Sequence, residues 1–370
     1  MCFRRSSVWI GVAKMVPARQ KSVARTPNSV VQRKSKIKSY RQSYQSMTAA
    51  SRLCLTRALT SLWLNTSRTA PKSDNILDKV DPRQLASLMK TEWQLSYVTP
   101  LYQFRYTQLK SYSRQLSAFM AAEKEQVEDG ATQNFKVSFS VVHGLVETDY
   151  DAETILIQIY SKSFFAGQNE HQKPVWKGWL ACVNGNRDYI NSLPKEFISL
   201  PLFGSSGTEA LTALVKSWFQ KNFDCCFGSL EINHISLQWL VALWTNYHAE
   251  SNIKQLQMIW TLPVQPLLQV SYAVNPVDAW ELWCSVKGDQ PELVKENKVI
   301  DIDDVMRLMK GLMGYFYRLF KVDLSAGSLS SVSTALGSAK CRGQIKISNS
   351  KCMTTTLTLL TECALLKMPI

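Results

Sequence analysis

Acidic residues are almost missing from one end of this 370-residue chain. Residues 1–75 contain fifteen Lys and Arg but a single acid, Asp74. The other residues balance at 28 basic against 28 acidic, so the net charge of +14 belongs to the N-terminal stretch alone. With 45% apolar residues and eleven Trp, the chain as a whole has the composition of a folded protein. These figures exclude a uniformly basic nucleic-acid coat protein and a wholly disordered chain.

The sequence also lacks the spacings that metal sites, disulfide frameworks and membrane spans require. Its nine Cys are odd in number and contain no Cys-x-x-Cys pair, and its four His lie at no ligand spacing. We therefore expect buried free thiols in a reducing compartment, with no metal and no cofactor. No apolar run reaches the roughly 18 to 20 residues of a membrane span, and the run at 8–13 is too short for a signal peptide. We expect a soluble, unsecreted protein, and the acid-free start leaves a mitochondrial presequence as an alternative.

Catalytic sequence motifs are missing as well. There is no Gly-x-Ser-x-Gly elbow, no Gly-Lys-Ser/Thr phosphate loop and no Gly-x-Gly-x-x-Gly. The glycine-bearing stretch at 204–209 is explained by Thr208 as a helix cap, followed by Glu209 in the positive first turn. The acidic run at 301–304 likewise suits a helix start. The sequence predicts no enzyme. A nucleic-acid-processing enzyme is kept as an alternative, although the carboxylate or nucleophile cluster that it needs is not evident.

The basic N-terminal stretch is predicted to be disordered. Residues 14–75 are rich in Ser, Thr, Lys and Arg without sustained periodicity. Half of the residues at 32–41 are basic, and this candidate nuclear-localisation signal contains Arg33, Lys34, Lys36, Lys38 and Arg41. We expect three parts: a disordered basic tail over 1–75, an N-terminal α+β subdomain over 76–200, and a C-terminal α+β subdomain with dimerisation strands over 201–370.

Hydrophobic periodicity divides the rest of the chain into blocks of helices and strands. Helical spacing predicts helices at 81–92, 107–126, 208–223, 236–248, 276–287 and 301–321. Extended or β-branched and aromatic runs predict strands at 93–98, 134–142, 154–160, 175–183, 254–262, 266–274, 328–336 and 342–348, with an antiparallel meander in the middle and a loop at 199–207. Residues 354–365 fit both a helix and a strand. Because the elements come in blocks and do not alternate strictly, the expected class is α+β with mostly antiparallel sheet.

A basic strand is predicted near the C-terminus. In an extended strand over 340–348, alternate side chains share a face. One face would carry Lys340, Arg342, Gln344, Lys346 and Ser348, and the other Cys341, Ile345 and Ile347. Such a stripe is either a solvated strand face with lysines that protect an edge, or a surface that contacts phosphates without reading bases. The candidate DNA-backbone residues are therefore Lys340, Arg342, Lys346, Lys351 just beyond the strand, and Lys162, which shares a strand face with Gln158 and Tyr160.

Three long stretches resemble the centromere protein L family of inner-kinetochore subunits. They are DPRQLASLMKTEWQLSYVTPLYQFRYTQLKSYSRQLSAFMAAEK (81–124), LPLFGSSGTEALTALVKSWFQKNFDCCFG (200–228) and FKVDLSAGSLSSVSTALGSAKCRGQIKI (320–347). Matching hydrophobic segments extend the similarity over about 76–370. Residues 1–75 do not match the short N-terminus that is usual in the family.

The resemblance implies a non-enzymatic scaffold of the constitutive centromere-associated network. It would pair with centromere protein N, and the pair would help to bind the nucleosome containing the centromeric variant of histone H3. Curved sheets would surround a positively charged passage for DNA, with contacts around Arg342 and Lys346; Gln344 departs from the family's lysine. The resemblance further implies a nuclear protein at the centromere and kinetochore that supports kinetochore assembly and chromosome segregation, with other network subunits as partners and no membrane contact.

The surface for the partner is expected on the C-terminal strands. Edge strands offer unpaired backbone groups to which a partner can add a strand. Deletion of 328–370 would then abolish pairing.

Overall fold

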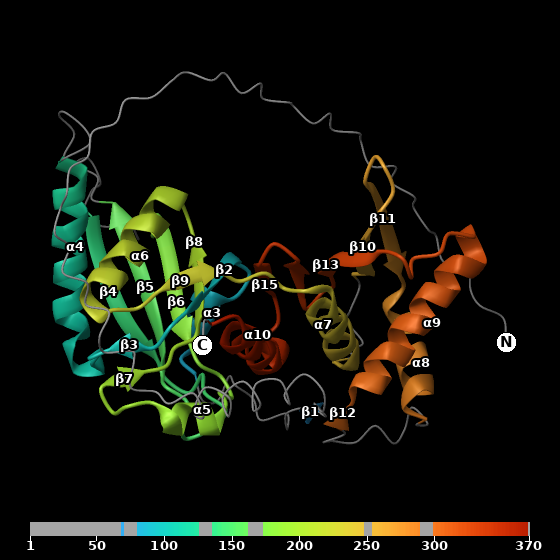
Figure 1. Ribbon diagram of the computed structural model, residues 1–370, viewed down its shortest axis with the longest axis horizontal. Helices are drawn as coiled ribbons and strands as arrows, with labels where there is room; N and C mark the ends of the chain where they lie inside the picture. Colours follow the sequence, from blue (N-terminus) through green and yellow to red (C-terminus); the bar gives the residue numbers. More distant parts are fainter. Residues whose placement is uncertain are drawn as a thin grey trace, which may run out of the picture.

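The body of the protein consists of helices and antiparallel strands (Figure 1). The structure, a computed structural model, describes residues 68–69, 80–125, 135–161, 173–247, 254–288 and 299–368. Apart from 68–69, the predicted tail lies outside the described residues, as do its basic residues Arg33, Lys34, Lys36, Lys38 and Arg41. The predicted α+β class with mostly antiparallel sheet is confirmed.

Most of the predicted elements are present, together with several short ones that the sequence did not indicate. The strands are β1 (Arg68–Thr69), β2 (Glu92–Val98), β3 (Leu101–Tyr102), β4 (Phe135–Val142), β5 (Thr154–Ser161), β6 (Trp176–Ala181), β7 (Phe197–Ile198), β8 (Leu202–Ser206), β9 (Phe227–Ser229), β10 (Leu256–Leu262), β11 (Leu268–Val274), β12 (Val299–Ile300), β13 (Ser328–Ser333), β14 (Gly337–Lys340) and β15 (Gln344–Ile347). The α-helices are α3 (Pro82–Leu88), α4 (Leu109–Glu125), α5 (Arg187–Ser192), α6 (Glu209–Phe223), α7 (His234–Asn246), α8 (Pro276–Lys287), α9 (Ile302–Phe320) and α10 (Met353–Lys367), with 3-10 turns η1 (Tyr106–Gln108) and η2 (Ser350–Cys352).

One sheet of eleven strands runs through the body. Its order is β11-β10-β13-β14-β15-β2-β8-β6-β5-β4, and neighbouring strands are antiparallel. The predicted meander is formed by β4, β5 and β6. In the middle of the order, β2 pairs with β8 along one edge, and with β15 and then β9 along the other. The predicted boundary at 200–201 falls just before β8, inside this sheet, and stays a proposal.

Alternate strand residues enter two apolar cores. Ile157 of β5 packs into the core that α4 and α6 cover, whereas the neighbouring Leu156 packs into the second core. The second core also contains side chains of α7, α8, α9 and α10. In Figure 1, α10 lies near the centre of the molecule, and it is buried almost all round. The element that the sequence left open at 354–365 is therefore an internal helix, a place where a helix needs no polar face.

The first predicted helix, at 81–92, is too long. Its start is confirmed, because Asp81 accepts a hydrogen bond from the Arg83 N–H and Pro82 opens the first turn. The helix ends at Leu88, since Lys90 is left-handed at φ +59° and the chain then enters β2. The left-handed conformation at Lys90 thus ends the helix earlier than the apolar spacing of the sequence predicted.

The predicted loop at 199–207 is wrong, because it contains β8. Small residues in this stretch suggested a turn, but the structure uses them for close packing. A Cβ on Gly204 would lie 2.3 Å from the Trp179 ring, so the glycine leaves room for that indole across the β6–β8 pair. Gly204 therefore does not mark a turn. It lets the Trp179 ring lie close to the backbone of β8.

The two C-terminal strands predicted at 328–336 and 342–348 are three strands, β13, β14 and β15. A turn at 341–343 reverses the chain between β14 and β15, and Gly343 has φ +75° in this turn. The single extended strand predicted over 340–348 is therefore wrong. Each of these three strands also has neighbours on both sides, so the expectation that they form an edge is wrong as well.

The true edges of the large sheet are β4 and β11, and they differ. Side chains from the helices close the outer edge of β4: Ser113 Oγ accepts from Phe139 N–H, and Ser117 donates to the Phe135 carbonyl. In the part of the chain that the structure describes, no comparable bond reaches the backbone of β11 from outside the sheet. Among the described residues, the large sheet thus has one edge covered by side chains and one open edge.

Candidate nucleic-acid interface

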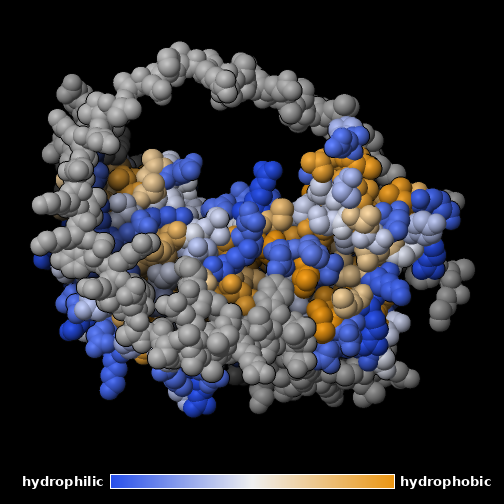
Figure 2. Space-filling model, viewed as in Figure 1, coloured by the Kyte–Doolittle hydropathy of each residue, from blue (hydrophilic) through white to orange (hydrophobic). Residues whose placement is uncertain are grey.

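Six neighbouring strands, from β11 to β2, form a broad polar surface. Their apolar side chains enter the second core on one face, so the alternate residues lie on the opposite face, which we call the open face. The open face consists of Gln269, Ser271, Ala273, Gln257, Ile259, Thr261, Ser328, Ser331, Ser333, Ser338, Lys340, Gln344, Lys346, Glu92 and Gln94. All are exposed or half-buried. Figure 2 shows a hollow in this region, with α6 on one side and the β10–β11 hairpin on the other.

Two predicted lysines lie on the open face. Lys340 ends β14 and Lys346 lies on β15, and the hairpin register pairs Lys340 with Gln344 and Ser338 with Lys346. The turn has three residues, which keeps the even spacing, so both lysines share a face although the strand reverses. As predicted, Ile345 and Ile347 are buried on the other side.

Arg342 and Lys351 flank the open face without belonging to its strands. Arg342 lies in the 341–343 turn, where its carbonyl accepts a hydrogen bond of 2.9 Å from the Gln94 side chain. Lys351 is exposed in η2, after β15 has ended. The structure therefore brings Lys340 and Lys346 together and places Arg342 and Lys351 at separate positions. Lys162 lies outside the described residues.

The sequence missed one lysine beside the open face. Lys216 of α6 donates a 2.8 Å hydrogen bond to Ser96, which follows Glu92 and Gln94 on the same face of β2. Its ammonium group lies 5.7 Å from the ring centroids of Phe203 and Phe227. Burial lowers the pKa of Lys216, and nearby Glu209 opposes that shift. In the sequence, the position of Lys216 among the apolar residues of α6 indicates that it lies on the core side of the helix. It does not indicate the hydrogen bond to Ser96.

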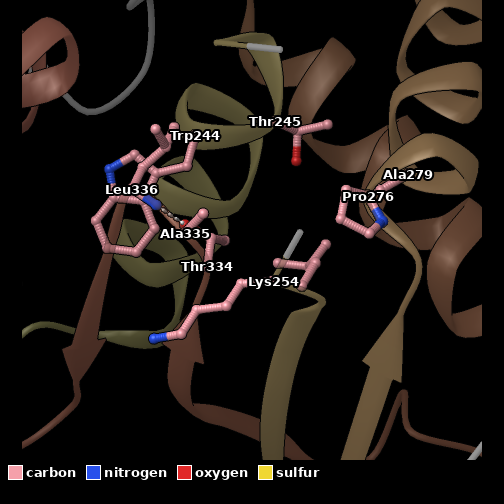
Figure 3. A pocket seen from close by; sticks show the side chains of 9 residues that line it. Trp244, Thr245, Lys254, Pro276, Ala279, Thr334, Ala335 and Leu336 are labelled. Carbon is pink, nitrogen blue, oxygen red and sulfur yellow. Dashed lines mark hydrogen bonds between the residues drawn. The ribbon is translucent and has the colours of Figure 1, made fainter. Parts of the chain in front are cut away.

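A small crevice on the core side offers little chemistry. It is lined by side chains of α7, the start of α8 and the 334–336 turn (Figure 3). Lys254 is its charged residue and extends away from Pro276 and Ala279. The Thr245 hydroxyl donates to the Val241 carbonyl of its own helix. These residues contain no acid–base pair or activated nucleophile.

The described residues form neither a metal-binding cluster nor a membrane-spanning helix. Within the described ranges, no three His, Cys, Asp or Glu side chains are grouped in a way that could hold a metal ion. The helices in those ranges include none with the length and apolar character needed to cross a membrane. The acidic run at 301–304 is a helix start, as predicted: Asp301 caps α9 in a capping box with Asp304. Thr208 caps α6 in the same way that the sequence indicated.

A comparison with protein families identifies the chain. A model of the family described as "Centromere protein L" matches residues 87–365. The chain belongs to the centromere protein L family. The open face and most of both cores lie inside the matched range, whereas residues 1–86 lie outside it.

Relatives with the same family name confirm the membership. Centromere protein L of Danio rerio is 57% identical over 314 residues, which is 84% of this chain and 84% of the relative. The Homo sapiens protein is 39% identical over 302 residues, covering 80% of this chain and 86% of the relative. The Gallus gallus protein is 38% identical over 292 residues, or 78% and 83%. This member of the centromere protein L family is therefore a centromere protein, the class that the sequence resemblance indicated.

Proposed function

We propose that this chain is a non-enzymatic subunit of the inner kinetochore that pairs with centromere protein N and binds DNA backbone through its open face. In this role it contributes to binding of the centromeric histone-variant nucleosome and, with other subunits of the constitutive centromere-associated network, supports kinetochore assembly and chromosome segregation in the nucleus. Family membership supports the setting. The open face supports the DNA contact.

The chemistry of the open face suits phosphate contacts without base reading. Hydroxyl and amide side chains donate hydrogen bonds to phosphate oxygens, and lysines add charge that draws the backbone in. Lys346 is half-buried and forms no ion pair with another described residue. This half-buried cation on a polar, hollowed face is the observation that carries the proposal.

Charge reversal tests the DNA contact. In the complex of this chain with centromere protein N, Lys346→Glu and the triple change Arg342→Glu, Lys346→Glu and Lys351→Glu are expected to weaken duplex DNA binding while pairing persists. Each lost phosphate contact reduces the slope of log K against log salt by about 0.9. Lys110→Glu on α4 makes the same charge change at an exposed site away from the open face. Equal affinity of all four proteins at low salt would overturn the assignment.

The free edge of β11 is the surface that we assign to centromere protein N. Main-chain groups on an open edge accept an added strand, and apolar side chains beside it are buried when a partner docks. Val264 is 50% exposed, Leu267 74% and Leu268 48%, all in or beside the loop that leads into β11. The C-terminal strands favoured by the sequence lack such an edge.

Two other readings of the sequence remain testable. Nuclease activity of the chain would be revealed by cleavage of DNA with magnesium or manganese, and we expect none. A mitochondrial protein would lose its location when 1–75 is removed. We propose instead that Arg33, Lys34, Lys36, Lys38 and Arg41 form a nuclear-localisation signal, so imaging of the shortened chain should show weaker nuclear accumulation.

A further inference from the structure

The open face contains a carboxylate among its lysines. Glu92 begins β2, and it is the acid among the described side chains that make up this face. On a surface that binds only phosphates, a carboxylate beside the lysines weakens binding, because it repels the phosphates that the lysines attract.

Glu92 holds one of the two lysines. Its Oε1 lies 2.9 Å from the ammonium nitrogen of Lys340, which also donates a 3.0 Å hydrogen bond to Gln344. The side chain of Lys340 thus crosses β15 and lies along the sheet. Both members of the ion pair are about half exposed, so the pair adds little to stability and an approaching phosphate can compete for the lysine.

Glu92 also faces the second lysine. In the antiparallel register, Lys346 on β15 lies directly opposite Glu92 on β2. Residues paired in this way have Cβ atoms roughly 4.5 to 5.5 Å apart. The carboxylate therefore lowers the positive potential at both Lys340 and Lys346, and one substitution at Glu92 affects both.

We propose that Glu92 limits the affinity of the open face for a nucleic-acid backbone by holding Lys340 on the sheet and by offsetting the charge of Lys346. The inference rests on the proposed DNA-binding function. Glu92 thus keeps DNA binding weak enough to be reversible. Lys340 contacts phosphate once the charge of its carboxylate partner is removed.

The substitution Glu92→Gln tests the proposal. It keeps the size and the hydrogen-bonding capacity of the side chain and removes its charge. In the complex with centromere protein N, we expect duplex DNA to bind about three- to tenfold more tightly at low salt, with a slope of log K against log salt that is steeper by about 0.9, because one more phosphate is neutralised. Glu281→Gln on α8 is the matched control, since it removes an exposed acid from the other side of the sheet.

A double substitution separates release of Lys340 from a general change in charge. If Lys340 makes the new contact, adding Lys340→Gln to Glu92→Gln removes most of the gain in affinity and restores the original slope. Lys340→Gln alone is expected to weaken binding, because it removes a cation of the open face and leaves the Glu92 carboxylate without its partner opposite Lys346. Fluorescence anisotropy with a labelled duplex, at several salt concentrations, measures all four proteins, and their unfolding midpoints show that each is folded.

The outcomes distinguish this inference from the function on which it rests. Unchanged or weaker DNA binding in Glu92→Gln, combined with weaker binding in Lys346→Glu, overturns the role of Glu92 and leaves the DNA-binding face standing. No change in either variant removes the DNA-binding face itself. A gain in Glu281→Gln equal to that in Glu92→Gln would show an effect of net charge alone and would also overturn the proposal.

Discussion

At the scale of single residues, Asp304 joins two helices through a buried ion pair. Its carboxylate accepts hydrogen bonds from Lys287 at the end of α8, from Arg307 at 2.6 Å, and from the Asp301 N–H at 3.1 Å. The side chains of Lys287 and Asp304 are 8% and 9% exposed. The acidic run indicated a helix start, but the partner on α8 lies seventeen residues earlier and no spacing rule connects the two.

Removal of the negative charge of Asp304 should destabilise the fold. Asp304→Asn is expected to lower the free energy of unfolding by about 3 to 5 kcal/mol, because it removes the carboxylate from a buried ion pair and weakens its hydrogen bonds to Lys287 and Arg307. Urea unfolding at neutral pH measures the loss. Asp303→Asn, one residue earlier on the exposed side of α9, is the control and should cost under about 0.5 kcal/mol.

The pH dependence of the same pair has a defined sign. Burial tends to raise the pKa of Asp304, but the hydrogen bonds from Lys287 and the Asp301 N–H outweigh it, so the pKa lies below its usual value. A carboxyl with a lowered pKa stabilises the fold fully above the unfolded-state value of about 3.9 and loses that contribution as the pH falls further. The difference in unfolding midpoint between the native chain and Asp304→Asn should therefore shrink below about pH 4. A constant difference would contradict the ion pair.

At the scale of elements, the β14–β15 hairpin places the lysines of the open face. The sequence prediction had one strand where there are two, yet it placed Lys340, Gln344 and Lys346 on a common face. The prediction of the face was correct because a three-residue turn preserves the alternation, and it failed for Arg342, which the turn removes from the strand. The alternation of side chains along a strand is a local property. The reversal of the chain at 341–343 depends instead on Gly343 and on the backbone at Leu230 beside it.

Gly343 is the residue on which this hairpin depends. It has φ +75°, and a Cβ there would lie 1.9 Å from the Leu230 carbonyl oxygen. Gly343→Ala is expected to lower the free energy of unfolding by more than about 2 kcal/mol, through strain and this clash. DNA binding should fall with it, because the turn sets the positions of Lys340 and Lys346.

A second glycine separates the cost of backbone strain from the cost of the clash with Leu230. Gly288 ends α8 at φ +68°, and a Cβ added there would meet no atom within 4 Å. Gly288→Ala should therefore cost about 1 kcal/mol from backbone strain alone and leave DNA binding unchanged. Equal losses in the two variants, measured by chemical unfolding, would show that the contact with Leu230 contributes nothing.

At the scale of the whole molecule, the two edges of the large sheet differ in how their backbone groups are hydrogen-bonded. Serines of α4 hydrogen-bond the outer backbone of β4, whereas in the described part of the chain the outer edge of β11 stays open beside apolar residues of its loop. An open edge next to exposed leucines is a liability for a protein that acts alone, and natural sheets normally cover or charge such edges. The asymmetry supports our proposal that a partner completes the β11 end of the sheet.

The paired substitution Leu267→Asp and Leu268→Asp tests this end. We expect it to reduce co-purification with centromere protein N at least tenfold, because charges at an apolar contact must be desolvated without a partner. Val175→Asp, at a position 43% exposed beside β6, is the control and should leave pairing intact. Full pairing by the double variant, with an unchanged unfolding midpoint, would place the partner elsewhere.

Deletion of 328–370 does not provide the same test. The deletion removes β13, β14 and β15 from the middle of the sheet and α10 from the second core. Loss of pairing would then report loss of the fold. Point substitutions at an exposed edge avoid this ambiguity because they leave both cores in place.

Local patterns in the chain were enough to establish the α+β class, the helix starts at Asp81, Thr208 and Asp301, the meander and the family, because periodicity, capping and long similar stretches are all properties of neighbouring residues. Tertiary structure alone decided the strand order, the burial of α10, the open edge and the pairing of Lys340 with Glu92. That pair spans 248 positions. Such contacts depend on how the folded chain brings distant segments together, and they set the local charge of the open face, which the net charge of +14 does not reveal.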